Sequence, residues 1–202
     1  MTLSPARTRG RPCAFDRDAA LQAAMLEFWA HGYDSTSIAA LTTAMDIRPP
    51  SLYAAFGDKR RLFGECIRLY QSTHGRTMEQ ILQGAPTGFD AVRGMLEFAA
   101  DDYTDASHPP GCLIITATAS HGPASAEVED ELRVLREAGT SQAERRIQDD
   151  IDAGRLPPDA DAARLARFYT TVLQGMSRQA QDGASAQELR EAAAMAMRAW
   201  PA

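Results

Sequence analysis

Residues 32–63, GYDSTSIAALTTAMDIRPPSLYAAFGDKRRLF, decide the fold of the N-terminal part of this chain. The pattern predicts a short helix over residues 37–45, and the hydroxyl of Thr36 can cap the start of that helix. A second short helix follows after a tight turn. Apolar side chains recur at positions that would hold the two helices together: Ile38, Leu41, Ile47, Leu52 and Phe56. This arrangement is typical of a helix-turn-helix, which presents its second helix to a DNA major groove.

Prolines fix the start of the second short helix. A residue that precedes a proline avoids the α region, so we expect Arg48 and Pro49 to be non-helical and Pro50 to be the first helical residue. The turn between the helices contains Asp46. An aspartate tolerates the left-handed conformation better than most residues, so the turn can form at some cost.

Helical periodicity dominates the rest of the chain. Further helices are predicted over residues 16–31, 58–83, 89–107, 124–152, 160–182 and 185–200, with Gly32 as a C-cap. Only residues 113–119, LIITATA, resemble a buried strand, and because no partner strand exists we interpret them as a buried helix. The predicted fold class is all-α.

Charge and composition narrow the function. The net charge is −6, but the part up to Arg61 carries +2 and the remainder −8, which suggests a localised nucleic-acid face on an acidic body. No stretch approaches the roughly 18 apolar residues of a membrane helix, and the N-terminus lacks the apolar core of a secretory signal. We therefore expect a cytoplasmic protein. Its three cysteines are widely spaced, so neither a disulfide framework nor a zinc site is predicted.

The helix-turn-helix segment resembles the head of TetR/AcrR-family transcriptional regulators. The family signature combines a glycine–aromatic pair, a Thr/Ser helix start, a Leu-Tyr pair and then F-x-x-K-x-x-L. The matching positions here are Gly32-Tyr33, Thr36-Ser37, Leu52-Tyr53, Phe56, Lys59 and Leu62. The resemblance implies a three-helix DNA-binding head over residues 16–63 and a helical effector-binding and dimerisation bundle over residues 64–202. It also implies a repressor that binds a palindromic operator in double-stranded DNA as a homodimer.

Specific DNA contacts follow from the same resemblance. It implies phosphate contacts from Thr36, Ser37, Tyr53 and Lys59, and a base-facing edge made of Arg48, Pro49, Pro50 and Ser51. Tyr53 as a packed aromatic and Lys59 as a solvated lysine remain alternatives. Proline offers no hydrogen-bond donor and can touch only a thymine methyl, so we expect Arg48, paired with a guanine, to supply most of the major-groove specificity.

A basic arm precedes the head. Residues 1–15 contain Arg9-Gly10-Arg11-Pro12, which resembles the core of an AT-hook. Arginines on either side of a glycine can enter the narrow, negative minor groove of A·T tracts. We therefore expect a flexible arm in which Arg9 and Arg11 supplement the head; a disordered, mildly basic tail is the alternative.

The body carries two further predictions. The last two helices have apolar faces that suit a dimer interface, namely Leu165, Tyr169, Val172, Met176, Leu189 and Ala196, although the same faces could pack on their own subunit's core. A pocket for an unknown small-molecule effector could be lined by Met95, Phe98, Tyr103, Cys112, Thr116 and Phe168, although such residues are more often core.

Cys112 is the sharpest candidate for a sensor in the body. It opens a predicted helix, where the helix dipole would lower the thiol pKa and favour a redox or electrophile response. A buried, inert thiol is the alternative.

Other function classes have less support. No phosphate-binding glycine loop, nucleophile motif, metal-ligand pair or cofactor motif is present in the sequence, so we expect no enzyme, no metal and no cofactor. A helical protein-interaction adaptor without sequence-specific DNA binding is the alternative. It gives no reason for a basic arm, a lysine at a helix start and adjacent Thr/Ser residues to share one module.

Overall fold

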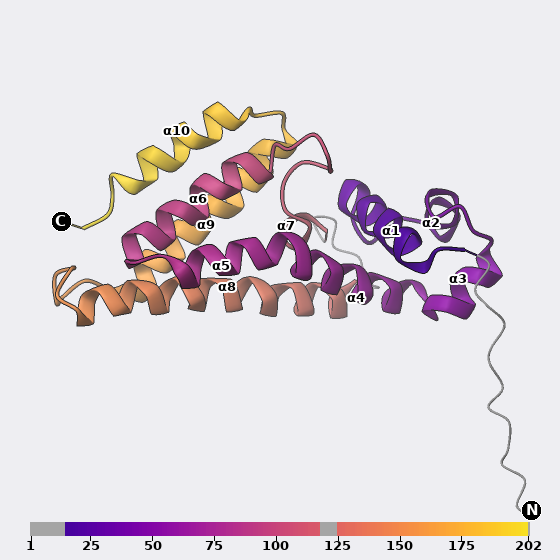
Figure 1. The fold of residues 1–202 in the computed structure, drawn as a ribbon, viewed down its shortest axis with the longest axis horizontal. Helices are drawn as coiled ribbons and strands as arrows, with labels where there is room; N and C mark the ends of the chain where they lie inside the picture. The colour runs from indigo at the N-terminus through magenta and orange to yellow at the C-terminus, as the bar shows by residue number, and fades with distance from the viewer. Residues whose placement is uncertain (1–14, 118–124, 202) are drawn as a thin grey trace, which may run out of the picture.

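The protein is described by a computed structural model that covers residues 15–117 and 125–201 (Figure 1). The helices are α1 (Arg17–His31), α2 (Ile38–Ala44), α3 (Pro49–Phe56), α4 (Lys59–Tyr70), the π-helical segment η1 (Gln71–Gly75), α5 (Arg76–Gly84), α6 (Gly88–Asp102), α7 (Leu113–Thr116), α8 (Ala126–Asp152), α9 (Ala162–Gln181) and α10 (Ala186–Met197). These residues contain no strand, and the predicted all-α class is confirmed. None of the described helices is both long and apolar enough to cross a membrane.

The head consists of α1, α2 and α3 packed on α4 around an aromatic and aliphatic core. Phe28, Leu41, Leu52 and Phe63 are each 0–1% exposed in that core. The ring of Phe28 meets that of Phe63 edge-on, with the ring centroids 5.0 Å apart. Gly32 ends α1 with φ 79°, as the predicted C-cap. Burial of these side chains fixes the angle at which α3 leaves the turn.

The starts of the two short helices each differ by one residue from the prediction. The N-cap of α2 is Ser37, whose hydroxyl accepts a hydrogen bond from Ala40 N, so the prediction that Thr36 caps this helix is wrong. Helix α3 begins at Pro49 rather than Pro50, and Arg48 is its extended N-cap. The fixed φ of proline suits the first turn of a helix, where backbone N–H groups lack intrahelical partners, so both prolines fit there.

Asp46 occupies the left-handed conformation that the sequence requires of the turn. Its φ is 51°, the only positive value at a non-glycine position among the described residues. This confirms that aspartate takes the place where such turns usually have glycine.

A helical rod joins the head to the body. Helices α4, η1 and α5 run on without a break, since Gln71 and Arg76 at the junctions keep helical dihedral angles (Figure 1). The long helix predicted over residues 58–83 is therefore present, with a π-helical turn inside it. Helix α4 crosses the predicted domain boundary at residue 63, so the two parts share a rigid element.

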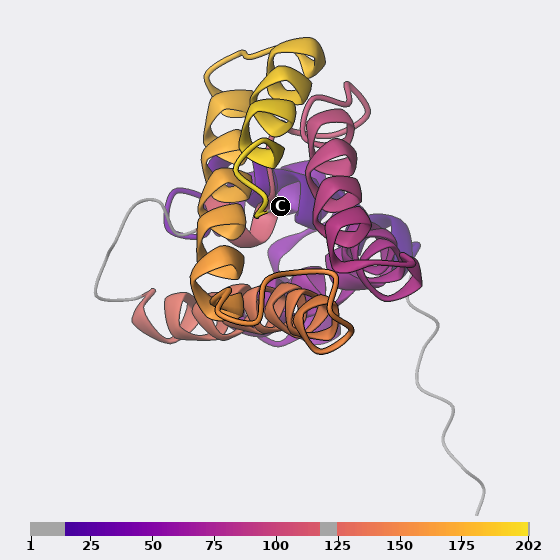
Figure 2. The ribbon, with the colours of Figure 1, turned by 90° about the vertical axis from the view of Figure 1, so that its left-hand side faces the viewer.

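In the body, α6 and α9 pack on α8, α10 packs on α6 and α9, and α5 contacts α6 and α8 (Figure 2). The predicted body helices are present and most are shorter than predicted, and the described residues 113–117 contain the four-residue helix α7. Helices α6 and α8 approach closely at Gly88. A Cβ atom there would lie 2.4 Å from the carbonyl oxygen of Arg146, so only glycine fits.

Candidate nucleic-acid interface and effector cavity

Helix α3 presents its N-terminal end at the pole of the molecule farthest from the C-terminus (Figure 1). Arg48, Pro49 and Pro50 are exposed, and Ser51 is half-buried. The side chain of Tyr53 is also exposed, at 50%, which rejects the alternative of a packed aromatic. Leu52 and Phe56 face inward and hold the helix on the head. The predicted base-facing residues therefore lie together at one outward edge.

Thr36 and Ser37 have different surroundings. Ser37 is exposed at the start of α2. Thr36 is 1% exposed, and its hydroxyl donates a 2.6 Å hydrogen bond to the carbonyl oxygen of Gly32. The buried hydroxyl of Thr36 therefore stabilises the loop between α1 and α2, whereas the side chain of Ser37 is exposed to solvent.

Lys59 is tied to the head by an aromatic contact. Its ammonium lies 4.4 Å from the ring centroid of Tyr33. Burial lowers the pKa of Lys59, although the nearby carboxylate of Asp34 opposes that shift. Two residues along, the side chain of Arg61 is 76% exposed, and its Nε lies 3.7 Å from Oδ2 of Asp58. Sequence reasoning missed Arg61, although its position in the first turn of the rod was a usable signal.

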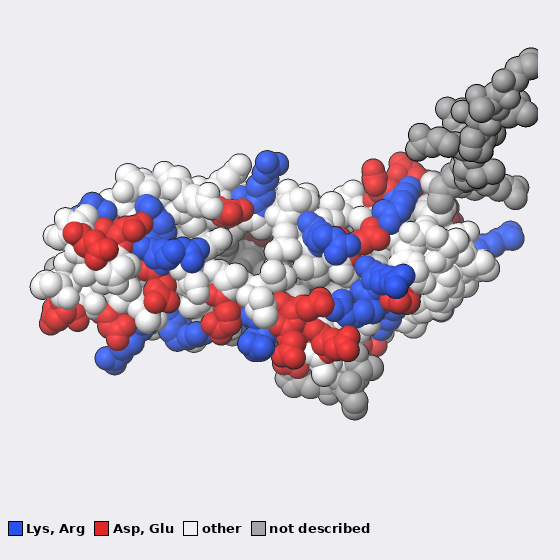
Figure 3. All heavy atoms as spheres, turned by 90° about the horizontal axis from the view of Figure 1, so that it is seen from below, with Lys and Arg blue, Asp and Glu red and all other residues white. Residues whose placement is uncertain are grey.

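Other basic groups near the head are paired with acids. Arg17 binds Glu65 at 2.8 Å, and Arg60 pairs with Glu131 of α8. Figure 3 shows acidic and basic side chains interspersed on the face seen from below. On that face, contacts to phosphates would rest on individually placed groups and not on a broad basic surface.

A shallow hollow lies between the end of α2 and the start of α3. Its lining comprises Phe15, Thr42, Thr43, Asp46, Ile47, Arg48 and Ser51. Thr43 is exposed beside the turn and was not among the predicted contacts. Predicted Arg9 and Arg11 lie outside the described residues.

A cavity of about 350 Å³ opens within the body. Four of the six predicted effector residues line it: Met95, Phe98, Tyr103 and Cys112. The other two do not. Thr116 donates a hydrogen bond to the carbonyl oxygen of Cys112, and Phe168 is 43% exposed on the outer side of α9. The cavity draws its walls from η1, α5, α6, α8 and α9 as well as the loop before α7, which periodicity alone could not bring together.

Cys112 is buried at the cavity wall. The hydroxyl of Tyr70 donates a hydrogen bond to its sulfur at 3.2 Å, and its backbone N–H donates to the Ser177 hydroxyl. Burial raises the pKa of the Cys112 thiol, and the hydrogen bond from Tyr70 only partly offsets that effect. The predicted lowering of this pKa is therefore wrong, because desolvation outweighs the dipole of a four-residue helix.

Comparison with known proteins supplies the family. Residues 20–66 match the family described as "Bacterial regulatory proteins, tetR family", and residues 88–196 match "Tetracyclin repressor-like, C-terminal domain". The HTH-type transcriptional repressor ComR of Escherichia coli (strain K12) is 34% identical over 200 residues, which cover 96% of this chain and 93% of ComR. The chain belongs to the TetR family of bacterial transcriptional regulators.

Other TetR-family proteins are similar to this chain over nearly its whole length. The repressor BdcR of the same organism is 32% identical over 97% of this chain and 94% of its own. A cysteine mutant of the TetR-family regulator CifR, solved with a 26-bp double-strand operator DNA, is 44% identical with a TM-score of 0.91, covering 95% of this chain and all of that one. A regulator from Rhodococcus sp. RHA1 is 35% identical with a TM-score of 0.61, over 92% of this chain and 100% of its own.

The apolar faces predicted for the TetR-type dimer point largely inward. Tyr169, Met176, Leu189 and Ala196 are buried within this subunit, and Leu165 and Val172 are half-buried. These faces build the subunit's own core, which was the alternative interpretation. The outer sides of α9 and α10 instead expose Phe168 at 43% and Met195 at 63%.

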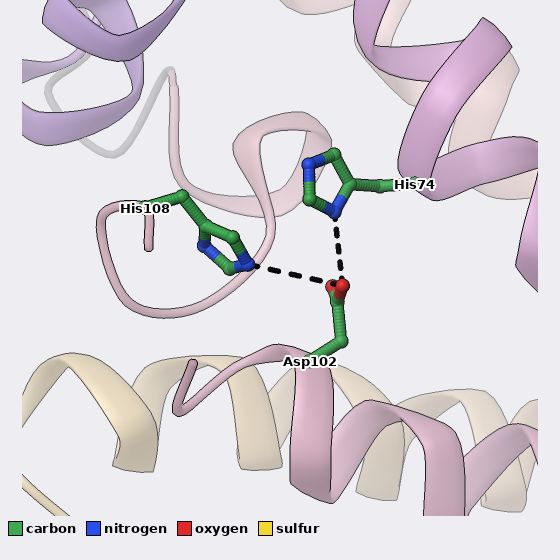
Figure 4. Close-up of side chains that lie close together, drawn as sticks. All are labelled: His74, Asp102 and His108. Carbon is green, nitrogen blue, oxygen red and sulfur yellow. Dashed lines mark hydrogen bonds and ion pairs between the residues drawn. The ribbon is translucent and has the colours of Figure 1, made fainter. Parts of the chain in front are cut away.

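One polar cluster joins the rod and the body. His74 of η1, Asp102 at the end of α6 and His108 of the following loop converge, with their candidate ligand atoms within 4.8 Å of one another (Figure 4). The sequence predicts no metal site, since these residues show no motif spacing. Only the fold brings them together.

Proposed function

We propose that this chain is a transcriptional repressor that binds a palindromic operator as a homodimer in the cytoplasm and is released by a small-molecule effector. The exposed edge of α3 is the observation that carries the proposal. Arg48 and Tyr53 project there from a helix whose opposite side is held in the core. The likeness to CifR, a structure with operator DNA, supports this use of the head.

The proposed contacts on DNA divide by chemistry. Arg48 hydrogen-bonds a guanine through N7 and O6, while Pro49 and Pro50 fill space against thymine methyls. Ser51 lies beside them. Ser37, Tyr53 and Lys59 contact phosphates, and Arg61 joins them. Thr36 acts from inside by fixing the loop before α2, since its hydroxyl already bonds the carbonyl oxygen of Gly32. The basic arm with Arg9 and Arg11 adds minor-groove contacts.

The proposed dimer uses the outer sides of α9 and α10. Phe168 and Met195 are large apolar side chains left exposed there. A second copy would cover them, and pairing two heads is what lets such proteins read both halves of a palindrome. Phe168, predicted in the effector pocket, is thereby reassigned to the interface.

The cavity provides the proposed means of release from DNA. A ligand that prefers one body conformation shifts the population toward it, and the two copies of α3 no longer match half-sites about one helical turn apart. The largely apolar lining favours a small ligand over thiol modification, because the thiol of Cys112 is buried and its pKa is raised. The proposed role is binding and signalling, with no catalytic step.

Fluorescence anisotropy of the purified protein tests the proposal. The probe is a labelled fragment from upstream of its own gene, at two salt concentrations and with excess non-specific competitor. Tight, salt-sensitive binding that survives the competitor is expected. If neither this fragment nor selection from random DNA yields a retained sequence, the adaptor interpretation replaces the repressor.

The variant Phe168→Glu tests the proposed dimer interface. A charged side chain at this position should convert the dimer to a monomer, as measured by light scattering.

A further inference from the structure

We propose that His74, Asp102 and His108 form a binding site for a divalent transition-metal ion where the head meets the body. Nδ1 of His74 lies 2.9 Å from Oδ1 of Asp102, and Nε2 of His108 lies 3.8 Å from the same oxygen (Figure 4). Two imidazoles and one carboxylate are a donor set that suits zinc, nickel and copper.

The spacing of these atoms fits an ion. A metal that keeps each nitrogen and oxygen about 2.0–2.2 Å away in tetrahedral geometry holds them roughly 3.4 Å apart. The separations of 2.9 and 3.8 Å from Asp102 to His74 and His108 fall on either side of that value. Small side-chain movements, of a few tenths of an ångström, would bring both nitrogen–oxygen separations to that value. The three side chains are 23%, 12% and 6% exposed for His74, Asp102 and His108, so few waters compete.

The hydrogen bonding of His108 favours a cation. Its Nδ1 lies 2.9 Å from the carbonyl oxygen of Pro109, which can only accept a hydrogen bond, so Nδ1 carries a proton. Nε2 is then the ring atom that faces the carboxylate of Asp102. A proton on Nε2 would make this contact an ion pair, and a metal ion in place of that proton would be coordinated by both atoms. A backbone carbonyl that binds the far nitrogen of a histidine is also the usual outer partner of a metal ligand.

The rings are held in place without the ion. His108 stacks on Trp29 at a centroid distance of 4.4 Å, and His74 stacks on Tyr70 at 5.2 Å. Trp29 also meets His74 edge-on at 5.0 Å. These contacts keep the ligand atoms oriented, so binding costs less ordering entropy.

The position of the cluster suggests that a bound ion would affect the orientation of the head. His74 lies on the rod that starts in the head, Asp102 ends a body helix, and Trp29 belongs to α1 of the head. His74 and Asp102 also line the 350 Å³ cavity, so a molecule bound in the cavity would lie beside the ion. An ion here would clamp the rod against the body and change the angle of the head. This regulatory role rests on the proposed DNA-binding function, whereas metal binding itself does not.

Calorimetry with Zn²⁺ on the chelator-stripped full chain tests the site. We expect saturable binding of one ion per chain. His74→Gln keeps an amide donor toward Asp102 but is a poor ligand, and His108→Gln is its counterpart; each should weaken binding at least about tenfold. His31→Gln, on an exposed histidine of α1, is the matched control and should bind as wild type. Absence of saturable binding, or unchanged affinity in the double Gln variant, overturns the site.

Tryptophan fluorescence localises the ion independently. The chain has two tryptophans, so Trp200→Phe leaves Trp29 alone, stacked on a proposed ligand. Paramagnetic Ni²⁺ should quench its emission and excess Zn²⁺ should restore it. His108→Gln should abolish this response in the same background. Quenching that persists in that variant places the ion elsewhere and rejects the proposal.

The operator anisotropy assay with added Zn²⁺ tests the coupling. We expect Zn²⁺ to lower operator affinity at least about fivefold in wild type, the low end of typical coupling between sites, with no change in His74→Gln. If Zn²⁺ binds but operator affinity stays constant, the regulatory coupling is rejected. If the chain binds Zn²⁺ but no DNA under any condition, the proposed function fails while the metal site stands.

Discussion

The head and the body of this protein place their functional side chains in opposite ways. In the head, the proposed contacts are exposed, and Ser37, Arg48 and Tyr53 lie within 17 positions of one another in the sequence. In the body, the residues that line the cavity are spread from Tyr70 to Gln174. A local sequence motif can predict an interface that lies on two neighbouring short helices. No local motif predicts the cavity, because its lining residues come from distant segments of the chain.

The same contrast predicts where substitutions act. Changes at the head's outer edge should alter DNA recognition and leave folding intact, since those side chains make few internal contacts. Changes where helices of the body pack closely should mainly lower the free energy of unfolding. Substitutions in both regions test that division.

Gly88→Ala should be the most damaging. The new Cβ would lie 2.4 Å from Arg146 O and 2.9 Å from Arg146 C, backbone atoms that move only if α6 and α8 separate. We expect a loss of about 3 kcal/mol in the free energy of unfolding, measured by urea denaturation. Gly139→Ala on α8 is the control, since nothing lies within 4 Å of its Cβ, and it should be neutral or stabilising. Equal stability of the two variants would contradict the close packing.

Arg48→Ala should act on recognition alone. Loss of one bidentate guanine contact is expected to remove about 2 kcal/mol of discrimination at one base pair in each half-site, with unfolding unchanged. Arg61→Ala is the comparison: a lost phosphate contact should weaken binding to all sequences and reduce the salt slope by about 1. Anisotropy against single-base operator variants separates the two. Unchanged selectivity in Arg48→Ala would refute its assigned role.

Asp150→Asn should give the body a pH signature. Burial of Asp150 opposes its ionisation, but hydrogen bonds from the Gly88 and Phe89 backbone and from Arg155 prevail and hold its pKa below the usual value. A carboxyl whose pKa is lower in the folded state stabilises the protein above its unfolded pKa, about 3.9. That contribution disappears as pH falls through the folded pKa.

The variant should therefore cost about 1–2 kcal/mol at pH 7, and the difference from wild type should shrink as pH falls below about 4. Urea denaturation at several pH values measures it. Asp149→Asn, whose side chain is 58% exposed, is the control and should show little effect. A pH-independent deficit would indicate a packing cause.

Asp46→Gly should produce the smallest change, in the head. Glycine removes the steric cost of φ 51° but adds entropy to the unfolded chain, so a net gain of about 0.5 kcal/mol is expected. Asp46→Ala should instead destabilise by about 1 kcal/mol, because alanine tolerates this conformation poorly. Thermal unfolding of the pair measures both. The opposite order would contradict the assignment of the turn.

The sequence by itself determined the helical class, the turn at Asp46, the outward set around Arg48 and Tyr53, and the family. The turn and the outward set depend on residues within about one or two helical turns of each other, where periodicity, proline and glycine act directly, and the family signature spans only Gly32 to Leu62. The sequence pattern placed the cap of the first short helix at Thr36 and the first residue of the second at Pro50, each one residue away from the position found, because neighbouring residues compete for a cap.

Tertiary structure alone decided the rest. An apolar face does not state whether it meets its own core or a second copy, so Tyr169 and Leu189 became core and Phe168 became surface. The pKa of Cys112 depends on burial, which local sequence does not record. His74, Asp102 and His108 have no motif spacing. They meet because the rod, α6 and the following loop are packed together, and the geometry of that packing is a property of the whole fold.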